Sequence, residues 1–247
     1  DIRDALSRLG KSRRRAGGYV QEWYAPRAAA ELLHFRSFLE QYEHADVLRV
    51  VLARAARSAR LTTHFDLEFP KAPQREPYWC YKHRRICHPV QEADKFLSRY
   101  LLDTLDRLSQ FQRVRDGSRD AEILHGDARD VRLEGRFAGV LTSPPYPGLI
   151  DYHEQHRYAY ELLGLDDRRE RELGAAARGT SHAALEAYVD GISDVLRRCA
   201  ASLGPEVPVI VVVNDRRLLY PEILERSGLR LVERLERHVN RRTGRRA

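Results

Sequence analysis

Ser143, Pro144, Pro145 and Tyr146 form a short polar and aromatic segment directly after an apolar run. The two consecutive prolines fix two φ angles and remove two main-chain donors, so we expect a rigid loop whose carbonyl groups point outward. Ser143 adds a hydroxyl, and Tyr146 adds a flat ring. Such a loop suits a planar ligand that donates hydrogen bonds from an exocyclic amine, and a nucleobase flipped out of its stack is a ligand of this kind.

The segment and its surroundings resemble the amino-group DNA methyltransferases, which use S-adenosylmethionine as methyl donor. TSPPY at 142–146 follows the strand-like FAGVL at 137–141 and is similar to the catalytic tetrapeptide of that family, while GDA at 126–128 resembles its acidic loop. Pro-Pro-Tyr alone also occurs in ligand motifs for small recognition domains. The preceding apolar run and the GDA loop favour the methyltransferase interpretation.

The resemblance implies a role for each residue of the segment. Ser143 and the main-chain carbonyl of Pro144 would accept hydrogen bonds from the target amine, next to the rigid Pro145, and Tyr146 would stack on the extruded base. Asp127 and Ser143 would contact the cofactor, Asp127 at the adenine ring. Asp127 has an alternative interpretation as the side chain of an Asx turn that shapes its own loop.

Three functions remain open at this point. The favoured one is a site-specific DNA methyltransferase of a restriction-modification or related defence system, with a cognate restriction endonuclease as a possible partner. Serine at position 143 is commoner in family members that methylate cytosine N4, whereas aspartate is commoner in adenine-N6 enzymes. The alternatives are an RNA guanine-N2 methyltransferase, which generally has Asp or Asn at this position, and a non-catalytic DNA-binding protein with a degenerate methyltransferase fold.

Basic residues are the candidates for contacts with double-stranded DNA. The formal net charge is +7, which is compatible with a polyanionic partner but does not identify one. Arg84 and Arg85 lie in the aromatic and basic stretch YWCYKHRRICHP, and Arg241 and Arg242 lie in the C-terminal HVNRRTGRR. Both stretches suit phosphate contacts, although a solvated loop and a solvated tail explain them as well.

Two cysteines and two histidines lie close together in the same aromatic and basic stretch. Cys80, His83, Cys87 and His88 suggest a zinc site, but their pairs do not follow the usual spacing of structural zinc ligands. The favoured interpretation is a basic aromatic loop with incidental thiols, and no metal is predicted. The three cysteines of the chain do not form a disulfide-like framework, which is typical of a reducing compartment.

The elements that must position these residues divide the chain into two parts. Residues 1–118 are predicted to be mostly helical, as an insertion with a possible target-recognition role, and 119–247 to be the catalytic part of an α/β, Rossmann-like methyltransferase domain. In the first part, apolar stripes at 32–42 and 90–108 predict helices, and 65–89 is predicted to be irregular. In the second, strands are predicted at 121–125, 137–141, 207–213 and 229–235; one helix is expected to begin at Ser181 and another to stop at Gly228.

The Rossmann-like sheet predicted from these strands is incomplete. A glycine-rich loop after a first strand, which the family uses to hold the cofactor, is not found in this sequence. The chain also has no methionine, not even at position 1. We therefore expect an excerpt of a longer protein whose cofactor loop lies upstream, or downstream in a permuted order. No apolar run is long enough for a membrane span, so a cytoplasmic location is expected.

Overall fold

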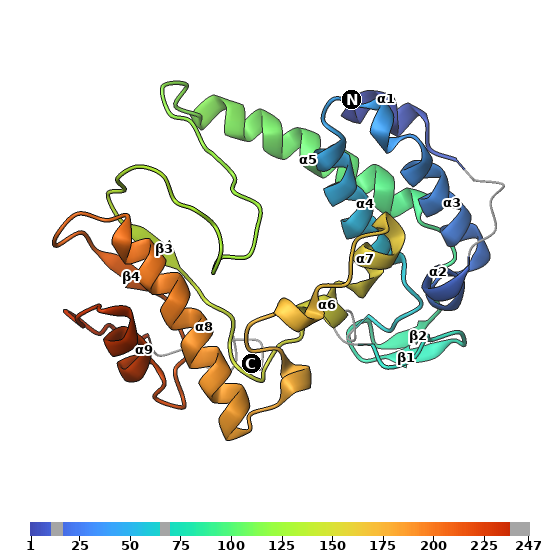
Figure 1. Ribbon diagram of the computed structural model, residues 1–247. Helices are drawn as coiled ribbons and strands as arrows, with labels where there is room; N and C mark the ends of the chain where they lie inside the picture. The colour runs from blue at the N-terminus through green and yellow to red at the C-terminus, as the bar shows by residue number, and fades with distance from the viewer. Residues whose placement is uncertain (11–16, 65–69, 238–247) are drawn as a thin grey trace. The chain divides into compact units, whose positions relative to one another are not determined.

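The computed structural model describes residues 1–10, 17–64 and 70–237, which form two compact units (Figure 1). Unit 1 comprises Asp1–Asp120 together with His153–Asp167, and unit 2 comprises Ala121–Tyr152 together with Arg168–Ala247. Residues 153–167 pack with the N-terminal part, although the sequence analysis placed them in the second part, 119–247. Among the described helices, none combines the length and apolar content that crossing a bilayer would require.

Unit 1 is helical, as its apolar stripes predicted. Its central helix α4 (Ala45–Ala59) packs against several others, and α4 residues three or four apart, including Leu48, Leu52 and Ala55, are fully buried. The remaining helices are α1 (Ile2–Ser7), α2 (Gly18–Trp23), α3 (Pro26–Ser37), η1 (Leu39–Gln41), α5 (Asp94–Val114), α6 (Tyr152–Gln155), which begins at the boundary between the units, and α7 (Arg157–Leu163).

The start of α5 is fixed by a buried carboxylate from another helix. Glu31 of α3 is fully buried and accepts hydrogen bonds from the main-chain N–H groups of Ala93 (2.5 Å) and Asp94 (3.0 Å). Its other oxygen accepts from Arg27 Nε at 2.7 Å. The first N–H groups of a helix have no partner within the helix, so Glu31 serves as a cap supplied from 62 residues away in the sequence.

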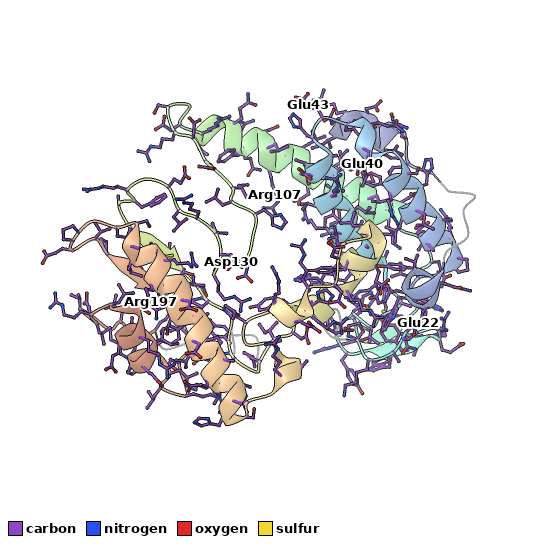
Figure 2. All side chains as sticks on the ribbon, in the orientation of Figure 1. Glu22, Glu40, Glu43, Arg107, Asp130 and Arg197 are labelled. Carbon is purple, nitrogen blue, oxygen red and sulfur yellow. The ribbon has the colours of Figure 1, made fainter. Side chains whose placement is uncertain are left out.

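Only the first half of α5 is covered by the core of unit 1. Leu97 and Leu101 are fully buried, whereas Leu108 is 47% exposed and Phe111 is 61% exposed. The apolar stripe at 90–108 therefore predicted the helix correctly, but the buried face of the helix is shorter than the stripe predicted. Side chains of the second half, such as Arg107, project beyond the packed helices of this unit (Figure 2).

The stretch at 65–89, predicted to be irregular, contains a β-hairpin. Strands β1 (Tyr78–Cys80) and β2 (Arg85–Cys87) pair antiparallel, with Cys80 opposite Arg85. The connecting turn has no glycine or asparagine, and Arg84 adopts the positive φ of 51° that these residues usually supply. The prediction was wrong here because the usual turn signal is missing.

Unit 2 contains a parallel strand pair covered by two helices. Strands β3 (Val140–Thr142) and β4 (Val209–Val211) pair parallel, with Val140 opposite Val209. This confirms strands within two of the four predicted runs. The other elements are η2 (Arg169–Arg171), η3 (Ala176–Arg178), α8 (His182–Ala201) and α9 (Tyr220–Ser227). Ser181 caps α8 by accepting from Ala184 N, and Gly228, with φ of 71°, ends α9, as predicted.

Two predicted strands of unit 2 are not strands. Residues 121–125 and 229–235 have no regular structure and are mostly exposed, Ile123 at 91%. The strand pair itself is covered on one face only, because Leu141 is 74% exposed and Ile210 is 55% exposed. An apolar run forms a strand only when a neighbouring strand satisfies its main chain, and within the described part of unit 2 these two runs have no such neighbour.

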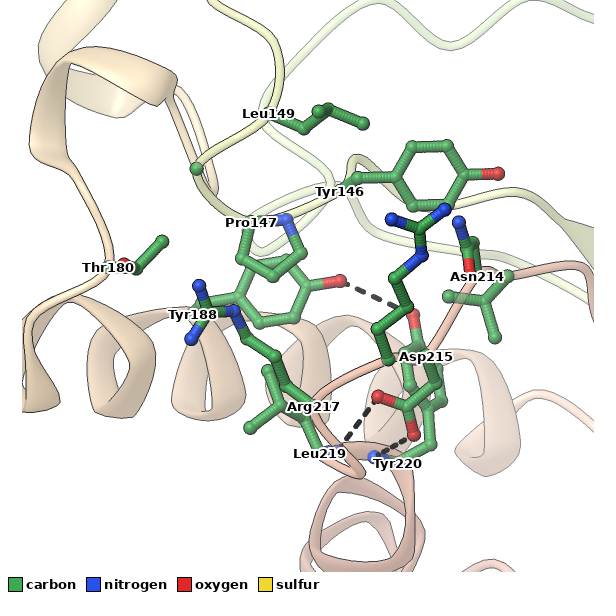
Figure 3. Close-up of a pocket in the computed structure, with 13 residues that line it drawn as sticks. Tyr146, Pro147, Leu149, Thr180, Tyr188, Asn214, Asp215, Arg217, Leu219 and Tyr220 are labelled. Carbon is green, nitrogen blue, oxygen red and sulfur yellow. Dashed lines mark hydrogen bonds between the residues drawn. The ribbon is translucent and has the colours of Figure 1, made fainter. Parts of the chain in front are cut away.

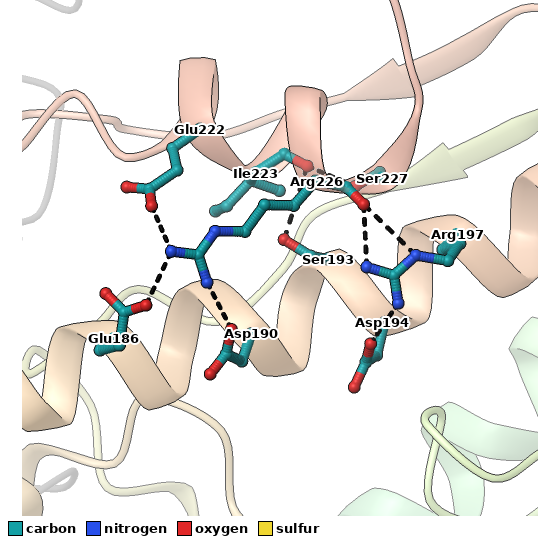
Figure 4. Close-up of polar contacts among 9 residues, drawn as sticks. All are labelled: Glu186, Asp190, Ser193, Asp194, Arg197, Glu222, Ile223, Arg226 and Ser227. Carbon is teal, nitrogen blue, oxygen red and sulfur yellow. Dashed lines mark hydrogen bonds and ion pairs between the residues drawn. The ribbon is translucent and has the colours of Figure 1, made fainter.

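Helices α8 and α9 are joined by apolar packing and by a charged cluster. Tyr188, Ile192 and Leu196 of α8 are buried with Tyr220 and Ile223 of α9. Figure 4 shows Arg226 of α9 directed toward three carboxylates, those of Glu186, Asp190 and Glu222, while Arg197 donates to the Arg226 carbonyl. The pair of helices thus forms a fixed support beneath the strands and the loops that leave them.

Candidate active site

The loop that follows β3 is anchored to α8 through its second proline. The hydroxyl of Tyr188 donates a hydrogen bond to the Pro145 carbonyl at 2.8 Å. Tyr188 is almost fully buried, and the hydroxyl of Tyr220 lies 3.4 Å from its own. Burial raises the pKa of Tyr188, so the phenol stays protonated and remains a donor. The prolines stiffen the loop, and this bond fixes where it lies.

The groups expected to accept hydrogen bonds from a target amine are not used within the described protein. The Ser143 hydroxyl and the Pro144 carbonyl have no hydrogen-bond partner among the described residues. Ser143 is exposed, whereas Pro144 is buried. The Pro145 carbonyl, by contrast, is already occupied by Tyr188. The Ser143 hydroxyl and the Pro144 carbonyl, to which the resemblance gives the role of acceptors, therefore remain available. The Pro145 carbonyl instead anchors the loop to α8.

A pocket of about 190 Å³ opens beside this loop (Figure 3). One wall is the loop after β3, including Tyr146 and Pro147, and another is the loop after β4, including Asn214 and Arg217. Tyr188 and Tyr220 close it from the helices. Both loops leave the carboxyl ends of parallel strands, where ligands bind in α/β sheets, and they meet in this one pocket.

Asp215 holds the second wall of the pocket in place. Its two carboxylate oxygens accept from the main-chain N–H groups of Leu219 (2.9 Å) and Tyr220 (3.0 Å) at the start of α9. An anionic group at the N-terminus of a helix satisfies unpaired donors and interacts favourably with the helix dipole. These bonds fix Asp215 as a structural residue of the pocket wall, visible as dashed lines in Figure 3.

The segment 171–176 connects the loop after β3 with the GDA loop. Gly148 N donates to Gly174 O at 2.9 Å and Ala176 N donates to Ile150 O at 3.1 Å, so the two segments are tied by main-chain bonds. On the other side, Arg129 Nη2 donates to the Arg171 carbonyl at 3.2 Å. Gly174 is required at this junction because its φ is +70° and a Cβ there would lie 3.1 Å from Pro147 Cα.

Asp127 in the GDA loop is engaged by Arg129. Its carboxylate accepts from the Arg129 main-chain N–H at 3.0 Å and from the guanidinium at 2.9 and 2.5 Å. The side-chain bonds with Arg129 lower the pKa of Asp127 to about 2, although desolvation opposes the change. The turn around Asp127 is thus an Asx turn with an added ion pair, and contact with a cofactor stays a prediction for this residue.

Replacing Arg129 by Met is expected to raise the pKa of Asp127 from about 2 toward its ordinary value of 3.8. The lowered pKa means that the ion pair stabilises the folded state above the ordinary pKa and that this contribution is lost as the pH falls toward 2. At neutral pH we expect a loss of about 1–2 kcal/mol. Carboxyl NMR titration measures the pKa directly. Arg132→Met, at an exposed position in the same loop region, is the control, and an equal change in both variants would contradict the assignment.

Replacing Tyr188 by Phe is expected to loosen the loop after β3. The substitution leaves the carbonyl of Pro145 without its donor, at a cost of about 1–2 kcal/mol. Hydrogen exchange should become faster at Gly148 N and its neighbours, because the loop would lose its link to α8. Tyr220→Phe keeps the bond between Tyr188 and Pro145 and serves as the matched control. Equal exchange rates in both variants would show that the bond does not hold the loop.

The predicted DNA contacts fall in different parts of the chain. Arg84 and Arg85 lie on the hairpin of unit 1 and are exposed, together with the neighbouring Trp79 and Tyr81. Arg241 and Arg242 lie outside the described residues. A role in binding nucleic acid stays a prediction for all four arginines.

The structure brings together three of the four suggested metal ligands, with a different fourth residue. Cys80, His83 and Cys87 come together, whereas His88 is not part of the group and His64 takes its place. His64 was missed because it lies 16 residues before Cys80, across a proline-containing stretch. In the active-site region, the sequence also did not reveal the roles of Tyr188, Tyr220 and Asp215. The two tyrosines lie among apolar residues and therefore resemble ordinary core residues. Asp215 lies in a loop, where aspartate is a common turn residue.

A comparison with known proteins supports the class of protein that the sequence resembles. No protein-family model matches the chain, and no solved structure matches it. The chain is 40% identical to the Type II methyltransferase M.MjaII of Methanocaldococcus jannaschii over 247 aligned positions, which cover 92% of this chain. The alignment covers 46% of that protein, so the chain spans about half its length. The predicted resemblance to methyltransferases is thereby confirmed.

Proposed function

We propose that this chain carries the target-base half of the active site of a site-specific DNA methyltransferase that uses S-adenosylmethionine. The observation that carries the proposal is the loop after β3, which is anchored through Pro145 while Ser143 and Pro144 keep their acceptors available. The similarity to a Type II methyltransferase supports the reaction class. Restriction modification is the setting in which we expect such an enzyme, with a cognate endonuclease as partner.

The chemistry follows from the two acceptors. The lone pair of an exocyclic amine is delocalised into the ring, so the nitrogen is a poor nucleophile. Hydrogen bonds to the Ser143 hydroxyl and the Pro144 carbonyl draw the amine protons out of the ring plane and localise the lone pair. S-adenosylmethionine supplies the electrophilic methyl group. As the nitrogen–carbon bond forms, the sulfur–carbon bond breaks and the nitrogen releases a proton to solvent. Fixed orientation of the amine supplies much of the rate enhancement.

We assign the pocket beside Tyr146 to the target base. Its volume of about 190 Å³ is smaller than the roughly 300–1,000 Å³ typical of whole ligand sites, so we assign to it the base alone and not the cofactor as well. The aromatic rings of Tyr146 and Tyr220 suit stacking on a planar base, and the Asn214 amide can bind a base edge. Ser143 and Asp127 are the described residues that we assign to the cofactor, whose remaining contacts we expect from the glycine-rich element.

Cytosine N4 is the favoured target, with adenine N6 as the alternative. The preference rests on Ser143. In the family that the sequence resembles, serine at this position is commoner in the members that methylate cytosine. Arg84 and Arg85 on the exposed hairpin, and Arg241 and Arg242 near the C-terminus, are proposed to contact the DNA backbone. Arginine is suited to bidentate phosphate contacts.

The substrate class is tested by incubating the protein with labelled S-adenosylmethionine and either duplex DNA or tRNA. The assay uses the 247-residue chain. Because a glycine-rich cofactor loop is not found in this chain, the assay is repeated with a longer polypeptide that would supply the loop. Label incorporated into DNA and not into tRNA supports the proposal. Label only in tRNA would favour the guanine-N2 alternative, and DNA binding by the longer polypeptide without transfer would favour the degenerate, non-catalytic alternative.

A further inference from the structure

Two cysteines and two histidines of unit 1 bring four metal-ligand atoms together. His64 lies beyond the end of α4, Cys80 ends β1, His83 lies in the hairpin turn and Cys87 ends β2. One ligand atom from each residue lies within 4.8 Å of all the others. We propose that His64, Cys80, His83 and Cys87 bind one zinc ion in a tetrahedral Cys₂His₂ site.

Three sulfur-to-nitrogen separations among the ligand atoms match those of a tetrahedral zinc complex. Sγ of Cys80 lies 3.5 Å from Nδ1 of His64 and 3.6 Å from Nδ1 of His83, and Sγ of Cys87 lies 3.5 Å from that same His83 atom. Zinc bonds of about 2.3 Å to sulfur and 2.0–2.1 Å to nitrogen, at tetrahedral angles, place sulfur and nitrogen roughly 3.6 Å apart. The three distances therefore agree with ligands around a shared centre.

Hydrogen bonding within the protein does not account for this arrangement equally well. The thiols of Cys80 and Cys87 both approach Nδ1 of His83, but one nitrogen lone pair accepts a single proton well. Both cysteines are buried and both are free. Nδ1 of His64 also lies 3.0 Å from the Tyr78 hydroxyl, a contact that a metal bond would replace. A cation at the centre satisfies all four groups at once.

The hairpin explains how cysteines with an unusual spacing meet. Cys80 pairs with Arg85 across the strands, and Cys87 lies two residues further along β2, so both thiols are on the same face of the hairpin. His83 enters from the turn, where Arg84 adopts a positive φ. The antiparallel register thus replaces the short Cys-to-Cys gap by which structural zinc sites are usually recognised.

The hairpin also needs a stabilising link. Its strands have three residues each, and an isolated two-stranded hairpin is marginally stable in water. The cross-strand pair of Trp79 and Ile86 is about half exposed and contributes little buried area. A zinc ion bound by His64 as well would tie the hairpin to the segment that follows α4. It would thereby fix the exposed Arg84 and Arg85 in position.

The direct test is the metal content of the full 247-residue chain, purified in reducing buffer without chelator and analysed by mass spectrometry of the elements. We expect one zinc per chain, and cobalt substitution should give the intense absorption of a tetrahedral site with thiolate charge transfer. Less than about one tenth of an equivalent, with no uptake of added zinc by the folded reduced protein, would overturn the proposal. Stoichiometric iron in place of zinc would overturn the metal assignment.

Substitutions test the ligand set. His83→Ala removes an exposed ligand and is expected to reduce zinc affinity by at least about 100-fold, whereas His88→Ala, next to Cys87 but outside the group, should retain full zinc content. Cys199→Ser controls for the remaining thiol. Circular dichroism confirms that each variant is folded. Full zinc retention by His83→Ala, or loss from His88→Ala to the same extent, would contradict the site. Because the readout is bound metal, its result is separate from that of the methylation assay.

Discussion

Ser143→Ala is expected to lower the rate of methyl transfer about 10²–10³-fold, the range found when one preorganised hydrogen-bonding group is removed from an active site. The hydroxyl has no other partner among the described residues, so its loss should leave the fold unchanged. The affinity for S-adenosylmethionine is expected to change far less, because the hydroxyl is proposed to act chiefly on the target amine. Single-turnover transfer and equilibrium cofactor binding measure the two effects.

Tyr146→Ala should behave like Ser143→Ala, because its ring is proposed to stack on the base. Ser109→Ala, on the exposed second half of α5, is the matched serine control and should leave transfer unchanged. If cofactor binding and transfer fall equally in the two active-site variants, the loop shapes the fold and does not act on the base.

Glu31→Ala is expected to destabilise unit 1 by about 3 kcal/mol, because it leaves two main-chain donors at the start of α5 without partners. The Ala93 and Asp94 N–H groups would lose their only acceptor in the described structure, and Ala93 is fully buried. Both tryptophans of the chain, Trp23 and Trp79, lie in unit 1, so denaturant unfolding followed by tryptophan fluorescence reports on this unit.

The pH dependence gives this prediction a second readout. Burial tends to raise the pKa of Glu31, but the bonds from Arg27, Asp94 and Ala93 outweigh it, and the pKa is lower than that of a free carboxyl. The contribution of Glu31 is therefore present above the ordinary carboxyl pKa and is lost as the pH falls through its lowered value. The difference between wild type and variant should shrink in acid. Glu22→Ala, on the exposed side of α2 (Figure 2), should cost less than about 0.5 kcal/mol.

The sequence predicted the parts of the fold that depend on local patterns. The stripe that includes Leu32 and Phe35 is buried, Ser181 caps α8 and Gly228 ends α9, because periodicity, capping and left-handed glycine act over a few residues. The loop after β3 and the loop after β4 meet because parallel strands place their carboxyl ends at the same edge.

Features that depend on distant partners were not predictable in this way. Nothing near Glu31 indicates that it caps a helix 62 residues later, and nothing near Tyr188 indicates that its hydroxyl binds the Pro145 carbonyl. The apolar run at 121–125 has the composition of a strand, but no neighbour in the described part of unit 2 pairs with it. His64 joins the cysteines only through the fold of the hairpin.

Ser143 and the Pro144 carbonyl are proposed to activate an exocyclic base amine. The most direct measurement is to digest the methylated DNA to nucleosides and to identify the labelled product. Labelled N4-methylcytosine, lost in Ser143→Ala and retained in Ser109→Ala, is the predicted result. Label at a ring carbon, as in 5-methylcytosine, or undiminished label in Ser143→Ala would contradict the account.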